Sequence, residues 1–387
     1  MVDIAQQAAL HPASAKDAAA ARVPLTAIDP GQWRALAQRA IEPNGYYLPA
    51  WALAVSATAR SRTNASALPA FDKTSSRLIG LMPVISLWRA CKIPLPALVS
   101  AHPYGTLCSP LIDRDAPIEA ATQVLQQARK AGAHALVLND VALDGAAMNA
   151  LKQALSRDGL KPRILSSYLR ASLDATQDDE MLLRDALGGK KLKEQRRLRH
   201  RLEEHGPVTF DVARRPDEIG PALETFLKLE ASGWKGKRGT ALVQHAGDAA
   251  FIRRAVPALA ETAQCEIITL RAGTTPVAAG IVLRHQDRAF FFKLGIDERF
   301  AKYSPGVQLT LDLTRHLCAD PLIASADSTA SADHPMINPI WRGRFAIGDV
   351  LIPLRRHDPM VALIHASLVA RGLARETARR AIHLLRK

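Results

Sequence analysis

The fold is decided by residues 265–317, which read CEIITLRAGTTPVAAGIVLRHQDRAFFFKLGIDERFAKYSPGVQLTLDLTRHL. Three apolar segments separated by short turns predict an antiparallel meander: Glu266–Leu270, Val277–Leu283 and Ala289–Ile296. A helix is expected over Pro305–Leu317, because proline suits the first helical position, where no N–H is needed. A strand near Leu322–Ala326 follows, so this half of the chain reads as a mixed α/β unit.

The start of the expected helix is a candidate phosphate site. Ser304 can cap the helix, and Gly306 lets a ligand approach the backbone closely. The N–H groups of Gly306 and Val307 would then face outward at the positive end of the helix dipole, with Lys302 nearby. The alternative is an ordinary capped helix without a ligand.

The first half of the chain repeats this order of elements, which predicts a duplicated α/β module. Its expected strands are Leu78–Ile85, Leu107–Ile112, Ala135–Leu138 and Arg163–Leu173, and its expected helices are Trp33–Ile41, Ala116–Ala131 and Ala146–Leu155. Residues 61–76 are small and polar, so a surface loop is expected there.

Changes in composition divide the chain into five parts. We expect a disordered tail over 1–22, a first module over 23–175, a basic linking helix over 176–206, a second module over 207–356 and an amphipathic helix over 357–387. Seven basic residues lie between Lys190 and Arg201. A run of charge is usually a solvated helix face, and no aromatic residue apart from His200 accompanies this one. Binding of nucleic acid by this helix is therefore not expected. Packing of the last helix on the body is expected, with contact to a membrane surface as the alternative.

Charge points to an anionic partner. The chain has 51 Lys and Arg against 37 Asp and Glu, a formal charge of +14, which suits a phosphorylated cofactor, nucleic acid or an acidic membrane. The four cysteines form no CxxC pair, so no metal site is expected. Walker, GxGxxG and HExxH motifs are absent from the sequence, which excludes common kinase, dehydrogenase and metalloprotease patterns. The start of the sequence does not read as a signal peptide, and a cytoplasmic protein is expected.

Four further residues are candidate site residues. Trp234 and Lys235 lie in a glycine-bounded turn and could form a wall for the substrate, although a buried tryptophan that anchors the loop is the alternative. Asp327 and His334 follow the last expected strand of the second module. His334 could take a proton there, with Asp327 or Asp333 to orient it, or Asp327 could itself assist deprotonation. Ordinary loop structure explains these two residues equally well.

Several segments resemble the GNAT acetyltransferase superfamily, in the tandem-GNAT branch with the Fem-type peptidyl transferases and the CelD-type proteins of exopolysaccharide biosynthesis. The segments that carry the resemblance are Lys190–Gly206, Gly233–Gly236, Phe300–Gly306 and Glu42–Trp51. Where GNAT enzymes usually have Arg/Gln-x-x-Gly-x-Gly/Ala, this chain has Lys302-Tyr303-Ser304-Pro305-Gly306-Val307. The usual tyrosine after the fifth strand has no clear match.

The resemblance implies an α/β fold of two GNAT-like modules, each a twisted mixed sheet flanked by helices. It implies an N-acyltransferase that uses acetyl-CoA or another acyl-CoA as donor and a small-molecule amine as acceptor. Lys302, Ser304, Gly306 and Val307 would hold the pyrophosphate. Two alternatives stay open: a Fem-type enzyme that takes its acyl group from aminoacyl-tRNA, and a catalytically degenerate interaction protein in polysaccharide assembly.

Overall fold

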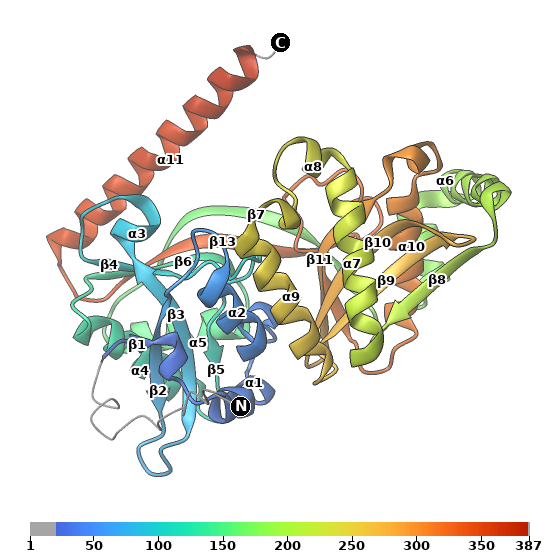
Figure 1. The fold of residues 1–387 in the computed structure, drawn as a ribbon. Helices are drawn as coiled ribbons and strands as arrows, with labels where there is room; N and C mark the ends of the chain where they lie inside the picture. Colours follow the sequence, from blue (N-terminus) through green and yellow to red (C-terminus); the bar gives the residue numbers. More distant parts are fainter. Residues whose placement is uncertain (1–20, 386–387) are drawn as a thin grey trace, which may run out of the picture.

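The computed structural model describes residues 21–385, apart from the side chains of residues 234, 235, 376 and 379–385. The tail predicted over 1–22 lies outside the described residues up to residue 20. Two α/β halves lie side by side, with β7 and β13 running between them (Figure 1).

The first half alternates short helices and strands. Its strands are β1 (Val23–Pro24), β2 (Ser66–Phe71), β3 (Leu78–Ser86), β4 (Ala97–Ser100), β5 (Leu111–Ile112), β6 (Ala135–Ala142) and β7 (Arg163–Asp174). Its helices are α1 (Pro30–Gln38), α2 (Pro49–Thr58), α3 (Leu87–Cys91), α4 (Pro117–Lys130) and α5 (Ala146–Arg157).

The second half begins with the basic helix. Its helices are α6 (Asp179–Leu202), α7 (Pro216–Ser232), α8 (Trp234–Lys237), α9 (Ala246–Ala260), α10 (Pro305–Cys318) and α11 (Pro359–Leu385). Its strands are β8 (Val208–Ala213), β9 (Cys265–Ala272), β10 (Thr275–His285), β11 (Arg288–Ile296), β12 (Ser325–Asp327) and β13 (Gly343–Pro353). The expected meander and the helix after it are therefore present.

All the strands belong to one sheet. Their order is β1-β2-β3-β4-β6-β13-β7-β12-β11-β10-β9-β8, and β5 pairs with β3. Two pairs are parallel, β4 with β6 and β11 with β12. These parallel pairs occupy matching places in the two halves, which confirms the predicted α/β fold of two modules.

The two halves exchange strands at their junction. β13 pairs with β6 through Ile352 and Leu136 and with β7 through Phe345 and Arg170. β7 in turn pairs with β12 through Leu173 and Ala326. The predicted boundaries place β13 in the second module, whereas its hydrogen bonds complete the sheet of the first.

The hydrophobic cores lie on both faces of the sheet. One continuous core joins α1, α2, α4 and α5 of the first half to α7 and α9 of the second; Trp33, Trp51, Phe226 and Phe251 are fully buried in it. On the other face, α6 and α10 cover β9–β11, and α3 and α11 cover β4, β6 and β13. Packing therefore ties the two halves together as the sheet does.

Two local predictions for the first half are wrong. The surface loop predicted over 61–76 contains β2, in which Ala67, Leu68 and Ala70 are buried. The prediction failed because the window is rich in serine and its small apolar residues gave no strand signal. Residues 66–71 form a strand because they pair with β1 and β3. The strand predicted over Leu107–Ile112 is reduced to β5, the last two residues.

The last helix leaves the body of the molecule. Val361 and Ile364 are buried against the first module, and α11 then projects away from it (Figure 1). Among the described side chains of α11, those that pack on this core lie between Met360 and Leu368. Between residues 21 and 385, no helix has both the length and the apolar character needed to cross a bilayer.

Strand exchange gives a prediction about fragments. A fragment of residues 21–175 lacks β13, so β6 and β7 each lose a partner and present open edges. We expect it to show no cooperative thermal transition by circular dichroism, whereas the full chain shows one. A peptide of residues 343–353 is the control, since adding it should restore part of the structure. A fragment that melts cooperatively alone would contradict this account.

Candidate active site

The start of α10 differs from the sequence prediction in its capping. Ser304 has φ 53° and ψ 49°, and its side chain makes no capping hydrogen bond. The short 3-10 turn Glu298–Tyr303 delivers the chain to this point, and the left-handed conformation of Ser304 turns it into the helix. The prediction that Ser304 caps the helix is therefore wrong. Pro305 occupies the first turn as expected, and that turn holds no acidic residue.

Gly306 forms part of a tightly packed wall. A Cβ atom at this position would lie 3.1 Å from Leu294 Cδ2 and 3.2 Å from the Met336 sulfur. The missing side chain thus lets strand β11 and the loop after β12 approach the helix start. The sequence suggested that glycine here admits a ligand, and the structure shows that it first admits these two side chains.

Strands β11 and β12 part just beyond this helix start. They are paired only from Arg288–Ser325 to Phe290–Asp327. Beyond that point β11 continues to Ile296, and its register with β10 shifts so that Phe291 faces Val282 and Lys293 faces Ile281. Phe292 is therefore the extra residue of a β-bulge, and a bulge leaves its extra residue without a ladder partner.

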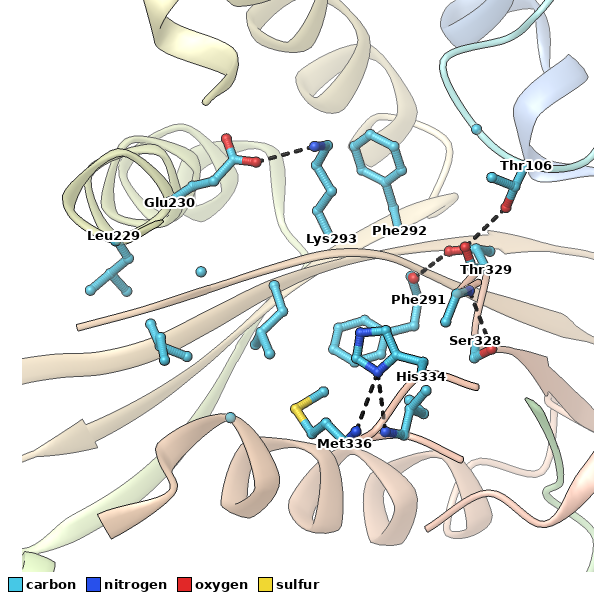
Figure 2. A pocket seen from close by; sticks show the side chains of 18 of the residues that line it. Thr106, Leu229, Glu230, Phe291, Phe292, Lys293, Ser328, Thr329, His334 and Met336 are labelled. Atoms are coloured by element: carbon cyan, nitrogen blue, oxygen red, sulfur yellow. Dashed lines mark hydrogen bonds and ion pairs between the residues drawn. The ribbon is translucent and has the colours of Figure 1, made fainter. Parts of the chain in front are cut away.

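A cavity of about 670 Å³ opens where the two strands part. Figure 2 shows that it has two sides: Phe292, Lys293 and Glu230 lie above strand β11, and His334 and Met336 lie below it, beside α10. The start of α10, Ser304–Val307, lines the lower side. The cavity thus connects the two faces of the sheet.

The first module supplies one wall of this cavity. Tyr46, Arg62, Tyr104 and Thr106 line it. The Tyr46 ring makes edge contacts with Trp51 and Phe290, each at 5.8 Å between centroids. Burial raises the pKa of Tyr46 well above its usual range, opposed by the neighbouring Thr329 hydroxyl, so this phenol is neutral.

A buried ion pair lies behind the cavity. Arg170 Nη2 donates to Asp327 Oδ2 at 2.7 Å, and both side chains are almost fully buried. Arg170 Nη1 also donates to the Thr106 carbonyl oxygen at 2.6 Å. Burial acts to lower the pKa of Arg170, but Asp327 together with Tyr168, Tyr46 and Asp140 outweighs it, so the pKa is raised. Asp327 is thus engaged by Arg170 and is not among the residues that line the cavity.

His334 lies in the cavity wall with its ring oriented by the backbone. Its Nδ1 accepts from the N–H groups of Met336 and Ile337, each at 3.4 Å (Figure 2). A neutral imidazole whose Nδ1 accepts carries its proton on Nε2. The role of His334 as a proton acceptor stays a prediction.

The remaining predicted site residues are Lys302, Trp234 and Lys235. Lys302 is exposed, and its Nζ lies 4.9 Å from the centre of the Tyr303 ring rather than in the cavity lining. Trp234 and Lys235 begin α8, but their side chains lie outside the described part of the structure. Gly233, one residue earlier, does line the cavity.

A carboxylate that the sequence analysis missed lies on the upper side. Glu230, at the end of α7, is buried and lines the cavity. Its Oε1 lies 3.2 Å from Lys293 Nζ, and its Oε2 accepts from the N–H of Leu242 at 3.0 Å. A carboxylate held in this way can receive a proton from a group bound beside it.

The sequence analysis missed these cavity residues for two reasons. Tyr46, Arg62 and Thr106 are far in sequence from Phe292, and only the docking of the two modules brings them together. Glu230 ends an amphipathic helix, where a charged residue usually marks the solvent side. Tyr46 lies in the segment Glu42–Trp51 that carries the family resemblance, but nothing in the sequence pattern assigned it to a site.

Residues 189–334 match the model of the acetyltransferase (GNAT) domain. This stretch of the chain is therefore similar in sequence to GNAT-type acetyltransferase domains. The match runs from the basic helix to His334, so it includes the parting strands and the start of α10. No curated protein matches the chain by sequence.

Solved structures extend the likeness to both modules. FemX superimposes with a TM-score of 0.56 at 12% identity, covering 87% of this chain and 98% of that one. L-PGS from Bacillus licheniformis gives 0.52 at 13%, covering 88% and 96%. The C-terminal domain of a putative lysylphosphatidylglycerol synthetase from Agrobacterium fabrum gives 0.52 at 13%, covering 88% and 95%. At these identities the likeness concerns the fold.

The buried ion pair yields a stability prediction. Asp327→Ala leaves Arg170 charged and unpaired in the interior, which should destabilise the protein by about 3–5 kcal/mol. The double variant Arg170→Met with Asp327→Leu removes both charges and should recover most of that loss. Urea denaturation of the three proteins tests this. If Asp327→Ala unfolds at the same urea concentration as the parent, Asp327 does not hold the junction.

Proposed function

We propose that the protein is an acyl-CoA-dependent N-acyltransferase whose second module holds the acyl donor. The observation that carries the proposal is the cavity where β11 and β12 part, with the start of α10 on one side and Glu230 on the other. The GNAT-type domain match over residues 189–334 supports it. The amine acceptor would enter from the side of the first module.

The residues on the lower side fit the donor. Free N–H groups at a helix start attract phosphate, and the first turn of α10 has no carboxylate to repel it. Gly306 and Val307 would supply these N–H groups. Met336 and Leu294 offer apolar contacts between this point and the bulge at Phe292. The extra backbone N–H of the bulge would polarise the thioester carbonyl.

The reaction needs little covalent chemistry from the protein. The acceptor ammonium first loses a proton, which we assign to the Glu230 carboxylate. The free nitrogen lone pair forms a bond to the carbonyl carbon, the C–S bond breaks, and its electron pair leaves on the sulfur. The second N–H proton then passes to the thiolate, directly or through water, giving amide and free thiol. Positioning of the two reactants supplies most of the acceleration.

A second candidate is transfer from aminoacyl-tRNA, in which the bond that breaks is an ester. The fold similarity to FemX and the basic helix α6 favour it. Lys190, Lys191 and Lys193 on α6 are exposed. A third hypothesis is an interaction protein in polysaccharide assembly without catalysis. Ligand binding separates the three.

Donor binding can be tested by thermal shift. A ligand present at 100 times its Kd adds about 2.7 kcal/mol to stability, so acetyl-CoA or a longer acyl-CoA should raise the Tm. Gly306→Glu and Val307→Glu should abolish the shift, because each places a carboxylate beside the phosphates. Val307→Gln is the matched control and should retain the shift, because it has the size of Val307→Glu without the charge.

The outcomes are distinct. Unchanged coenzyme A affinity in both glutamate variants would refute the placement at α10. A shift with aminoacyl-tRNA alone, weakening steeply with salt, would favour the second candidate. A well-folded protein that responds to neither ligand would favour the third.

The assigned base gives a kinetic prediction. Glu230→Gln keeps the hydrogen bond from Leu242 but cannot take a proton, so kcat should fall by about 10²–10⁴-fold. Coenzyme A affinity should stay unchanged. The measurement is the rate of thiol release from acetyl-CoA with a panel of small amines. A rate within a few-fold of the parent would exclude Glu230 as the proton acceptor.

A further inference from the structure

We propose that Arg62 forms an anion subsite on the first-module side of the cavity, so that the amine acceptor carries a carboxylate or a phosphate group. The inference rests on the proposed acyl transfer, since it names the class of amine that the transferase would accept. Arg62 belongs to the loop that follows α2 and lines the same cavity as Glu230 and the start of α10.

The guanidinium of Arg62 is held in place from three directions. Its Nη1 donates to the Arg60 carbonyl oxygen at 3.0 Å, and its Nε donates to His102 Nδ1 at 3.2 Å. Its Cζ lies 4.5 Å from the centre of the Tyr104 ring, a cation–π distance. A guanidinium fixed in this way has already lost most of the side-chain freedom that binding would otherwise cost.

The partners of Arg62 hold it without neutralising it. The carbonyl and the tyrosine ring carry no charge. Local burial and then the charge of Arg62 itself lower the pKa of His102, so that ring is neutral. Within the described part of the chain, Arg62 makes no ion pair, and its Nη2 makes no hydrogen bond.

The nearby carboxylates are already engaged elsewhere. Asp248, on α9, accepts from the Arg60 N–H at 2.8 Å and from the Tyr104 hydroxyl at 2.8 Å. Glu230 is paired with Lys293, the other cation of this side. The charge of Lys293 is therefore balanced by Glu230. The charge of Arg62 is not balanced in this way, and its Nη2 can donate to a ligand.

The same contacts explain how the subsite is positioned. Asp248 comes from the second module and binds both the backbone beside Arg62 and the ring beneath it. Ser61 has φ 62°, and Asn64 has φ 55°, so the loop turns sharply on each side of Arg62. Docking of the modules thus sets the place of the guanidinium relative to Glu230. Carboxylate and phosphate oxygens are the groups that a fixed guanidinium binds best.

The test compares matched amines with acetyl-CoA as donor. Glycine and O-phosphoethanolamine carry the two anionic groups, and glycinamide and ethanolamine are their neutral counterparts. We expect kcat/KM to be about 10- to 100-fold higher for at least one anionic amine than for its counterpart, as a charge-assisted hydrogen bond gives. Arg62→Gln should remove this preference, and Arg62→Lys should retain part of it, while coenzyme A affinity is unchanged in both. The two arms show whether carboxylate or phosphate is preferred.

The outcomes separate this inference from the function on which it rests. Failure of the parent protein to bind coenzyme A overturns the proposed function. If coenzyme A binds, the subsite is overturned when neither anionic amine is preferred or when Arg62→Gln keeps the preference. If no amine is acylated, calorimetry measures binding of the same four compounds to the coenzyme A complex instead. The ratios expected for kcat/KM are then expected for the binding constants. Equal binding of charged and neutral members then rejects the subsite.

Discussion

The exchange of β7 and β13 between the two halves is the constraint on which the rest of the structure depends. Each strand leaves the half that precedes it in sequence and pairs with the other, and Arg170 on β7 meets Asp327 on β12 in the interior. This fixes the end of β12, where the chain turns away and the cavity begins. The same guanidinium donates to Thr106, whose hydroxyl donates to the Thr329 carbonyl oxygen at 3.0 Å. Junction and cavity wall are therefore one hydrogen-bonded unit.

Because of this unit, the site belongs to neither module alone. The second module contributes the bulge at Phe292, the start of α10 and Glu230, and the first contributes Tyr46, Arg62 and Tyr104. Further contacts keep the loops of the first module in register: the Asn44 N–H donates to His285 Nδ1 at 2.8 Å, and Asp248 holds Tyr104. Burial lowers the pKa of His285 to about 4, so this contact stays neutral across the physiological range.

The sequence predicted the elements that depend on residues close together in the chain. The meander and the helix from Pro305 follow from apolar alternation and from proline at a helix start, and both are present. The cap at Ser304 was wrong because the preceding 3-10 turn forces a left-handed residue there. The sequence did not predict that β13 is exchanged, because the residues of a strand do not indicate which other strands it pairs with; here these are β6 and β7. Arg62 and Glu230 were missed for the same reason: their role arises from long-range packing, which periodicity does not encode.

The two parallel strand pairs explain why one module keeps an opening. In the first module, β4 and β6 also pair over three residues, from Ala97–Ala135 to Val99–Val137. Beyond these residues, the loop after β4 binds to the continuing part of β6. The Cys108 N–H donates to the Asp140 carbonyl oxygen at 3.1 Å, and the Asn139 N–H donates to Ser100 Oγ at 2.9 Å. The strand edge freed by the parting is thus satisfied by the protein itself. In addition, α4 has Glu119 in its first turn, where α10 has no acid. The two halves thus have equivalent places, and the loop that fills the first place brings Thr106 to the wall of the cavity in the second.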